Sequence, residues 1–160
     1  MSATDDARPA LGYILSMTDP TRISPQEASA KLAEGWTYVD VRTPQEFEAG
    51  HPPGAVNAPI MQAESGGMVP NPDFLAAMIA AFPMGAQIVV GCKAGGRSLR
   101  AAQALLGAGF TNVLDQRAGW DGARNQFGQI TEPGWSRAGL PVEEGHPEGR
   151  SWDDVKKRFR

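Results

Sequence analysis

The chain has 160 residues, of which 41% are hydrophobic and 21% are charged, and its formal net charge is −3. These values are ordinary for a globular protein, and the length suits one domain with a single core. The mild negative charge and the lack of a basic stripe argue against nucleic acid or an anionic membrane as the main partner. The single cysteine rules out a disulfide within the chain.

The ends of the chain are more polar than its middle. Residues 1–20 predict a flexible arm, residues 21–145 the folded domain and residues 146–160 a polar tail. The start of the chain lacks the positive stretch and long apolar run of a signal peptide, and no apolar run reaches the length of a membrane span. One cysteine also suits a reducing compartment, so we expect a cytoplasmic protein with no membrane partner.

The first predicted helix covers residues 24–35. Ser24 and Glu27 have the spacing of a capping box, in which each side chain bonds the backbone N–H of the other residue. Gly35 ends the helix. The β-rich and largely apolar run 36–41 follows and predicts a buried strand.

The same capping pattern returns at Thr43 and Glu46 and predicts a short helix that ends at Gly50. The turn-rich stretch 51–60 includes only a short β-like piece. Residues 71–82 predict an amphipathic helix, with the asparagine that begins this range as the N-cap.

The second half of the chain continues the alternation of strands and helices. Residues 86–91 predict a second buried strand, 97–109 a helix closed by glycines and 111–114 a third strand. The tract 118–134 is rich in glycine and polar residues and predicts a long loop, and 151–160 predicts a short terminal helix or a frayed end. This alternation indicates an α/β domain with a mostly parallel central sheet.

The only cysteine, Cys92, stands where the second predicted strand ends, and ligands of parallel sheets bind beyond the carboxyl ends of the strands. Lys93 and Arg97 place positive charge nearby, while Gly95 and Gly96 let the loop turn its backbone N–H groups toward one point. Cysteine reacts as its thiolate, which these features would stabilise. We predict a nucleophilic cysteine in a pocket that attracts an anion; the alternative is a small buried hydrophobe.

The length of the loop separates two reaction classes. Four residues lie between Cys92 and Arg97. Cysteine phosphatases and some arsenate reductases use a loop longer by one residue, because a tetrahedral oxyanion needs a wider ring of N–H groups. The shorter loop favours sulfur transfer over phosphate hydrolysis.

Three stretches of the chain resemble the single-domain rhodanese family, the thiosulfate-type sulfurtransferases. They are VDVRTPQEFEAGHPPGAVNAPI (39–60), CKAGGRS (92–98) and PGWSRAGLPV (133–142). Pro52 stands where the family has isoleucine, and the segment after Trp120 is longer than usual. The resemblance implies a rhodanese-like single domain of the α/β class, with helices on both faces of the sheet.

The resemblance also implies a mechanism. Cys92 would be the catalytic residue, would take the outer sulfur of a small anionic donor such as thiosulfate as a persulfide, and would release sulfite. An external thiol or cyanide would accept the sulfur, since the chain has no second cysteine, and neither a metal nor an organic cofactor is implied. The substrate-binding residues would be those of the loop: Lys93, Ala94, Gly95, Gly96, Arg97 and Ser98.

Three other functions remain open at this stage. A persulfide carrier would deliver sulfur to a protein partner and turn over free thiosulfate poorly. A cysteine phosphatase or arsenate reductase would need the longer loop. An inactive rhodanese-like module would not need Cys92.

Four residues outside the loop have predicted structural roles. Asp40, at a strand end, and Arg42 are possible supports of the loop. Arg42 and Glu46 are four residues apart and predict an ion pair. His51 is expected to bond backbone groups within a turn.

Overall fold

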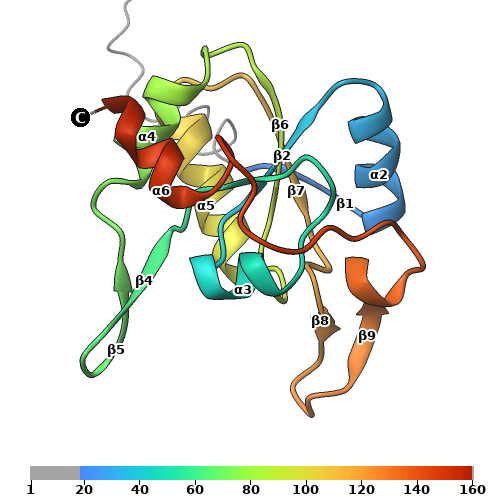
Figure 1. The fold of residues 1–160 in the computed structure, drawn as a ribbon. Helices are drawn as coiled ribbons and strands as arrows, with labels where there is room; N and C mark the ends of the chain where they lie inside the picture. The colour runs from blue at the N-terminus through green and yellow to red at the C-terminus, as the bar shows by residue number, and fades with distance from the viewer. Residues whose placement is uncertain (1–18, 160) are drawn as a thin grey trace, which may run out of the picture.

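The structure is a computed structural model that describes residues 19–159. Five strands form a sheet at the centre of the molecule (Figure 1). Every neighbouring pair in this sheet runs parallel, so the predicted α/β domain with a mostly parallel central sheet is confirmed. In spatial order the strands are β1 (Thr21–Ile23), β7 (Asn112–Gln116), β6 (Gln87–Gly91), β2 (Thr37–Asp40) and β3 (Val56–Asn57).

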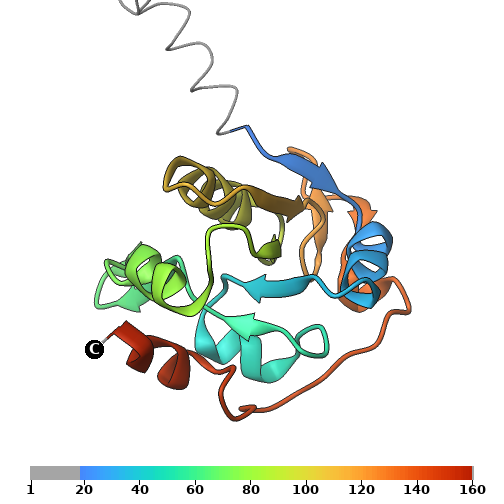
Figure 2. The same ribbon diagram turned by 90° about the horizontal axis from the view of Figure 1, so that it is seen from above.

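Helices cover both faces of this sheet. They are α2 (Pro25–Ala33), α3 (Pro44–Ala49), α4 (Phe74–Ala81), α5 (Gly96–Gly107) and α6 (Trp152–Val155), with the 3₁₀ helices η2 (Trp135–Arg137) and η3 (Lys156–Phe159). Seen from above, α4 and α6 lie together on one side of the sheet and α2 lies on the other (Figure 2).

The alternation of side chains along β6 divides the core into two clusters. Ile88 and Val90 pack with residues of α4, α5 and α6, whereas Val89 packs with residues of α2, α3 and η2. Successive side chains of a strand point to opposite faces, so a strand that is apolar throughout must be covered on both sides. Burial on both faces fixes the position of the carboxyl end of β6, where Cys92 follows.

The two predicted capping boxes begin α2 and α3. The Ser24 hydroxyl accepts the N–H of Glu27 at 3.0 Å, and the Glu27 carboxylate accepts the N–H of Ser24 at 2.8 Å. Thr43 and Glu46 make the same reciprocal pair. Both predicted helix starts are confirmed, since each depends on contacts only three residues apart.

Helix α4 begins later than predicted. The first helical residue is Phe74, and Asn71 is not the N-cap. Instead, the Asn71 side chain accepts the N–H of Asp73 at 3.0 Å and donates to the carbonyl of Pro59 at 2.7 Å. Asparagine favours such turns as readily as caps, and here the turn also ties the helix entry to the chain before the hairpin.

Two antiparallel hairpins project from the sheet: β4 (Met61–Glu64) with β5 (Gly67–Pro70), and β8 (Gly122–Arg124) with β9 (Ile130–Pro133). The second hairpin replaces the long loop predicted for 118–134. Its strands are short, with only Gly122 buried, and a register shift interrupts their pairing, so no apolar alternation marks them in the sequence.

The end of the chain packs on the domain, although residues 146–160 predict a polar tail. Trp152 and Val155 are buried in the same cluster as α4 and α5. Two apolar residues three apart on one helical turn are enough to attach this segment to the core. The arm predicted for residues 1–20 lies outside the described residues except for its last two. Within residues 19–159, no helix is long and apolar enough to cross a membrane.

Replacing Trp152 tests whether this terminal turn is part of the core. Trp152→Ala should lower the free energy of unfolding by about 3–5 kcal/mol, because a buried aromatic side chain leaves a cavity. Lys157→Ala, an exposed position in the same segment, should change it by less than about 1 kcal/mol. Urea denaturation measures both, and equal effects would show that the segment contributes no core packing.

Candidate active site

Cys92 is the first residue after β6 and begins the predicted loop, which leads into α5 at Gly96. Its sulfur accepts the backbone N–H of Gly95 at 3.1 Å and lies 3.4 Å from the Ser98 hydroxyl. The residue is only 2% exposed and also contacts the core cluster of α4 and α5. The side chain is therefore covered, but its sulfur faces hydrogen-bonding groups of the loop.

The turn of the loop requires glycine at one position. Gly95 has φ +99°, a conformation that L side chains rarely adopt, and a Cβ there would overlap the carbonyl oxygen of Arg117. The Gly95 carbonyl accepts a hydrogen bond of 2.9 Å from Arg22. A Cβ at Gly96 would meet only open space. Gly95 therefore turns the chain so that its N–H points at the sulfur.

The end of β7 and the residues after it support the loop, and we call residues 116–121 the cradle. The N–H groups of Trp120 and Asp121 donate to the carbonyls of Cys92 and Lys93, at 2.7 and 2.9 Å. Gly119 has φ +67°, and a Cβ there would lie 2.5 Å from the Lys93 carbonyl. The two chains therefore pack backbone against backbone, which sequence reasoning about the loop alone did not find.

An ion pair between an exposed arginine and a buried aspartate fixes the loop from the edge of the sheet. Arg22 of β1 bonds Asp115 of β7 at 2.6 Å and also holds the Gly95 carbonyl. Burial raises the pKa of Asp115, while its contacts with Ser98 and Arg22 act in the opposite direction. The Ser98 hydroxyl lies 3.4 Å from the sulfur of Cys92 on the other side of the loop turn. No local pattern in the sequence signals this pair.

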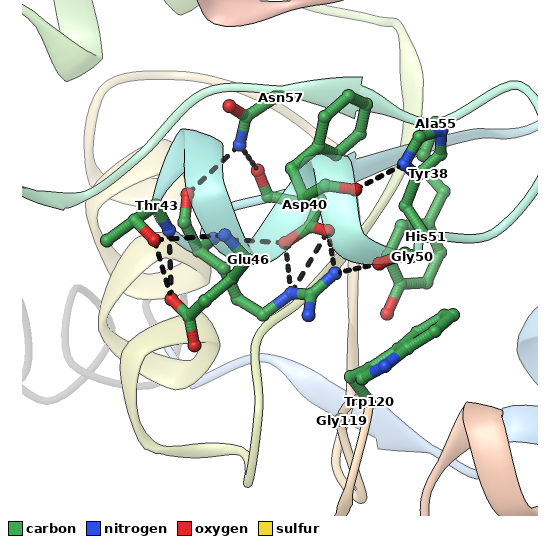
Figure 3. A network of polar contacts seen from close by, with 12 residues as sticks. Tyr38, Asp40, Thr43, Glu46, Gly50, His51, Ala55, Asn57, Gly119 and Trp120 are labelled. Carbon is green, nitrogen blue, oxygen red and sulfur yellow. Dashed lines mark hydrogen bonds and ion pairs between the residues drawn. The ribbon is translucent and has the colours of Figure 1, made fainter. Parts of the chain in front are cut away.

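Asp40 and Arg42 form a second ion pair, with both side chains buried, at the end of β2, where Figure 3 labels Asp40. Arg42 bonds Asp40 through two nitrogens, at 2.6 and 2.9 Å, and donates to the Gly50 carbonyl at 2.6 Å. Its guanidinium lies 5.0 Å from the ring centre of Trp120. The N–H of Trp120 donates to the carbonyl of Cys92. The Asp40–Arg42 pair is therefore linked to the loop through one residue, Trp120.

The predicted ion pair between Arg42 and Glu46 is wrong. Glu46 instead binds Arg97 with both oxygens, at 2.8 and 3.0 Å. Burial acts to raise the pKa of Glu46, but the hydrogen bonds from Arg97 and Thr43 outweigh it and hold that pKa at about 2. The structure thus places Arg97 beside the loop with its guanidinium already paired.

His51 bonds as predicted. One ring nitrogen lies 2.6 Å from the carbonyl of Phe47, and the other lies 2.9 Å from a Glu143 oxygen. The ring is fully buried and stacks on the Phe47 ring at 3.7 Å. Both nitrogens are occupied within the fold, which makes His51 a structural residue.

A pocket of about 530 Å³ opens beside the loop. Of the predicted substrate-binding residues, Lys93 and Arg97 line it, whereas Ser98 is buried behind the loop next to the sulfur. Ala94 is exposed at the tip of the loop. The residues that line the pocket are Thr43, Glu46, Met61, Met68, Lys93, Arg97 and Arg100.

Comparison with known proteins agrees with the resemblance seen in the motifs. A model of the rhodanese-like domain matches residues 24–126, which include the loop and the whole cradle. The chain belongs to the rhodanese-like domain family. The match spans four of the five strands of the sheet and begins just after β1.

Several relatives in this family carry an enzyme's name. The chain is 40% identical over 124 residues to "Thiosulfate sulfurtransferase 16, chloroplastic" of Arabidopsis thaliana, which covers 78% of the chain and 93% of that protein. It is 32% identical over 118 residues to the thiosulfate sulfurtransferase GlpE of Pseudomonas syringae, covering 74% of the chain and 100% of that protein. The crystal structure of Rv0390 from M. tuberculosis superposes with a TM-score of 0.64 at 28% identity, covering 78% and 98% of the two chains.

Adjacent glycines allow a matched test of the turn. Gly95→Ala should lower the free energy of unfolding by about 2 kcal/mol or more, because the new Cβ is strained at φ +99° and overlaps the cradle. Gly96→Ala should stay within about 1 kcal/mol of the original protein. Urea denaturation of both variants is the measurement, and similar losses in the two would contradict the proposed geometry.

The low pKa of Glu46 predicts a pH-dependent stability. A carboxyl whose pKa falls on folding stabilises the protein above its unfolded pKa, and this contribution disappears as pH falls through the folded value. The stability difference between the original protein and Glu46→Gln should therefore be full above about pH 5 and shrink toward pH 2. Arg97→Gln should remove part of this pH dependence, because the hydrogen bonds from Thr43 remain. A difference that is constant with pH would show that folding does not lower the pKa of Glu46.

Proposed function

We propose that the protein is a sulfurtransferase that moves sulfane sulfur from a thiosulfate-like donor to an external thiol or cyanide, through a persulfide on Cys92. The observation that carries this proposal is the N–H of Gly95 directed at the Cys92 sulfur at 3.1 Å, at the carboxyl end of a central strand. Relatives named thiosulfate sulfurtransferase support it. The fit of a single thiol to a reducing compartment supports a cytoplasmic location.

In the first step the Cys92 thiolate attacks the outer sulfur of thiosulfate. The S–S bond of the donor breaks, sulfite leaves with the bonding electrons, and Cys92 keeps the transferred sulfur as a persulfide anion. The negative charge passes from the Cys92 sulfur to the transferred sulfur of the persulfide, and backbone donors that are already in place near these two atoms stabilise it. The N–H of Gly95 supplies one such donor, and the start of α5 adds its dipole.

In the second step an external nucleophile attacks the outer sulfur of the persulfide and Cys92 leaves as its thiolate. The chain contains no other cysteine, so the acceptor comes from outside. We propose that the loop residues Lys93 to Ser98 bind the donor. Asp40 and Arg42 would act as loop supports, because Arg42 lies over the ring of Trp120. Lys93 is exposed at the pocket, whereas Arg97 is paired with Glu46 and would orient an anion less freely.

Intact mass spectrometry tests the proposal. After incubation with thiosulfate, the protein should gain the mass of one sulfur atom, and cyanide should remove it. Cys92→Ser should show no gain while keeping the circular dichroism spectrum of the original protein. A gain in the serine variant, or none in the original protein, would end the assignment.

An exposed aromatic residue favours one second candidate, a persulfide carrier for a protein acceptor. Phe127 is 77% exposed at the tip of the β8–β9 hairpin, where an apolar side chain has no packing role. A carrier would gain sulfur in the mass experiment but would show little turnover with thiosulfate and cyanide. Saturation kinetics with these two small molecules separate the two functions.

A further inference from the structure

The pocket beside the loop is larger than the proposed donor requires. Its volume of about 530 Å³ lies within the range of about 300–1,000 Å³ that organic ligands occupy. Thiosulfate and cyanide contain only a few atoms and would leave most of this space to water. The excess volume indicates a ligand with an organic body.

The charges at the pocket indicate the sign of that ligand. Three cationic side chains line it, from Lys93, Arg97 and Arg100, against the single carboxylate of Glu46. That carboxylate is paired with Arg97. Lys93 and Arg100 form no ion pair with any residue in the range 19–159. Two cations therefore remain available for an anion, and Arg100 lies one helical turn beyond Arg97 on α5.

The β4–β5 hairpin supplies an apolar wall. Ala63 pairs with Met68 across the hairpin, and Met61 lies two residues before Ala63 on the same strand, so both methionines share one face. Both line the pocket, and Met68 is 44% exposed. Methionine is flexible and polarisable, which suits contact with hydrocarbon chains of varied shape.

We propose that this pocket binds the sulfur acceptor, an anionic thiol whose carboxylate lies at Arg100 and Lys93 and whose hydrocarbon part lies against Met61 and Met68. This inference rests on the proposed function. The acceptor thiolate attacks the outer sulfur of the Cys92 persulfide, the S–S bond to Cys92 breaks, and Cys92 leaves as thiolate while the acceptor becomes a persulfide. No oxidant or reductant enters, because one S–S bond replaces another.

Three thiols separate the effects of charge and hydrocarbon. They are 6-mercaptohexanoate, the uncharged 6-mercaptohexan-1-ol of similar length, and the short mercaptoacetate. Protein that carries the Cys92 persulfide after reaction with thiosulfate is mixed with each thiol. The rate at which the protein loses this sulfur is compared at equal thiolate concentration. We expect 6-mercaptohexanoate to exceed the alcohol about fivefold, the size of a favourable exposed ion pair, and to exceed mercaptoacetate as well.

Matched variants assign each effect to its residues. Arg100→Gln should remove the preference for the acid over the alcohol, whereas Arg158→Gln, the same change in charge on η3, should keep it. The double change Met61→Ser and Met68→Ser should remove the preference for the long thiol over mercaptoacetate. Phe127→Ser, which removes an exposed apolar side chain from the other hairpin, should keep it. Equal rates for the three thiols, or preferences that survive in the pocket variants, would overturn the inference.

A binding measurement separates this inference from the proposed function. The inert thioether 6-(methylthio)hexanoate cannot accept sulfur, and it should shift the amide resonances of Met68 and Arg100 in NMR spectra more than 6-(methylthio)hexan-1-ol does. If thiosulfate loads no sulfur but the thioether acid binds at these residues, the proposed function fails and the anion-binding pocket stands. If sulfur loads and neither thioether binds there, the proposed function stands and the pocket assignment fails.

Discussion

The hydrogen bond from the Gly95 N–H to the Cys92 sulfur is the interaction on which the arrangement of the site depends. It forms only because Gly95 adopts a positive φ, and that conformation leaves no room for a side chain against the carbonyl of Arg117. The same turn starts α5, so one residue directs a donor at the sulfur and sets the direction of the helix. The position of the sulfur's donor and the start of α5 therefore both require glycine at residue 95.

Two ion pairs, each with a buried carboxylate, hold this turn. Arg22 joins the Gly95 carbonyl to Asp115, and Arg42 stacks on Trp120, whose N–H holds the carbonyl of Cys92. Pairs of this kind contribute little net stability, because removing charges from water offsets much of their attraction. Their value is geometric: they fix loop carbonyls so that the N–H of Gly95 stays directed at the Cys92 sulfur.

The features that the sequence predicted well depend on contacts between residues a few positions apart. The capping boxes and the position of Cys92 at a strand end are of this kind. The Arg42–Glu46 prediction failed because Arg42 precedes the N-cap Thr43, so the spacing rule for helix neighbours does not apply to it. Arg22 and its carboxylate partner lie 93 residues apart, and the cradle meets the loop only in the folded sheet. Contacts at that separation leave no periodic pattern in one sequence.

The order of strands in the sheet has a consequence for the synthesis of the chain. Strand β1 pairs with β7, in the register Thr21 with Leu114. In chain order these are the first and the last strands of the central sheet, so β1 cannot pair until β7 has left the ribosome. Long-range parallel pairing is slow to form because a large loop must close first. Cys92 leaves the ribosome before the cradle and before Asp115. Its loop therefore cannot reach the folded arrangement until the chain has been made well beyond the cysteine itself.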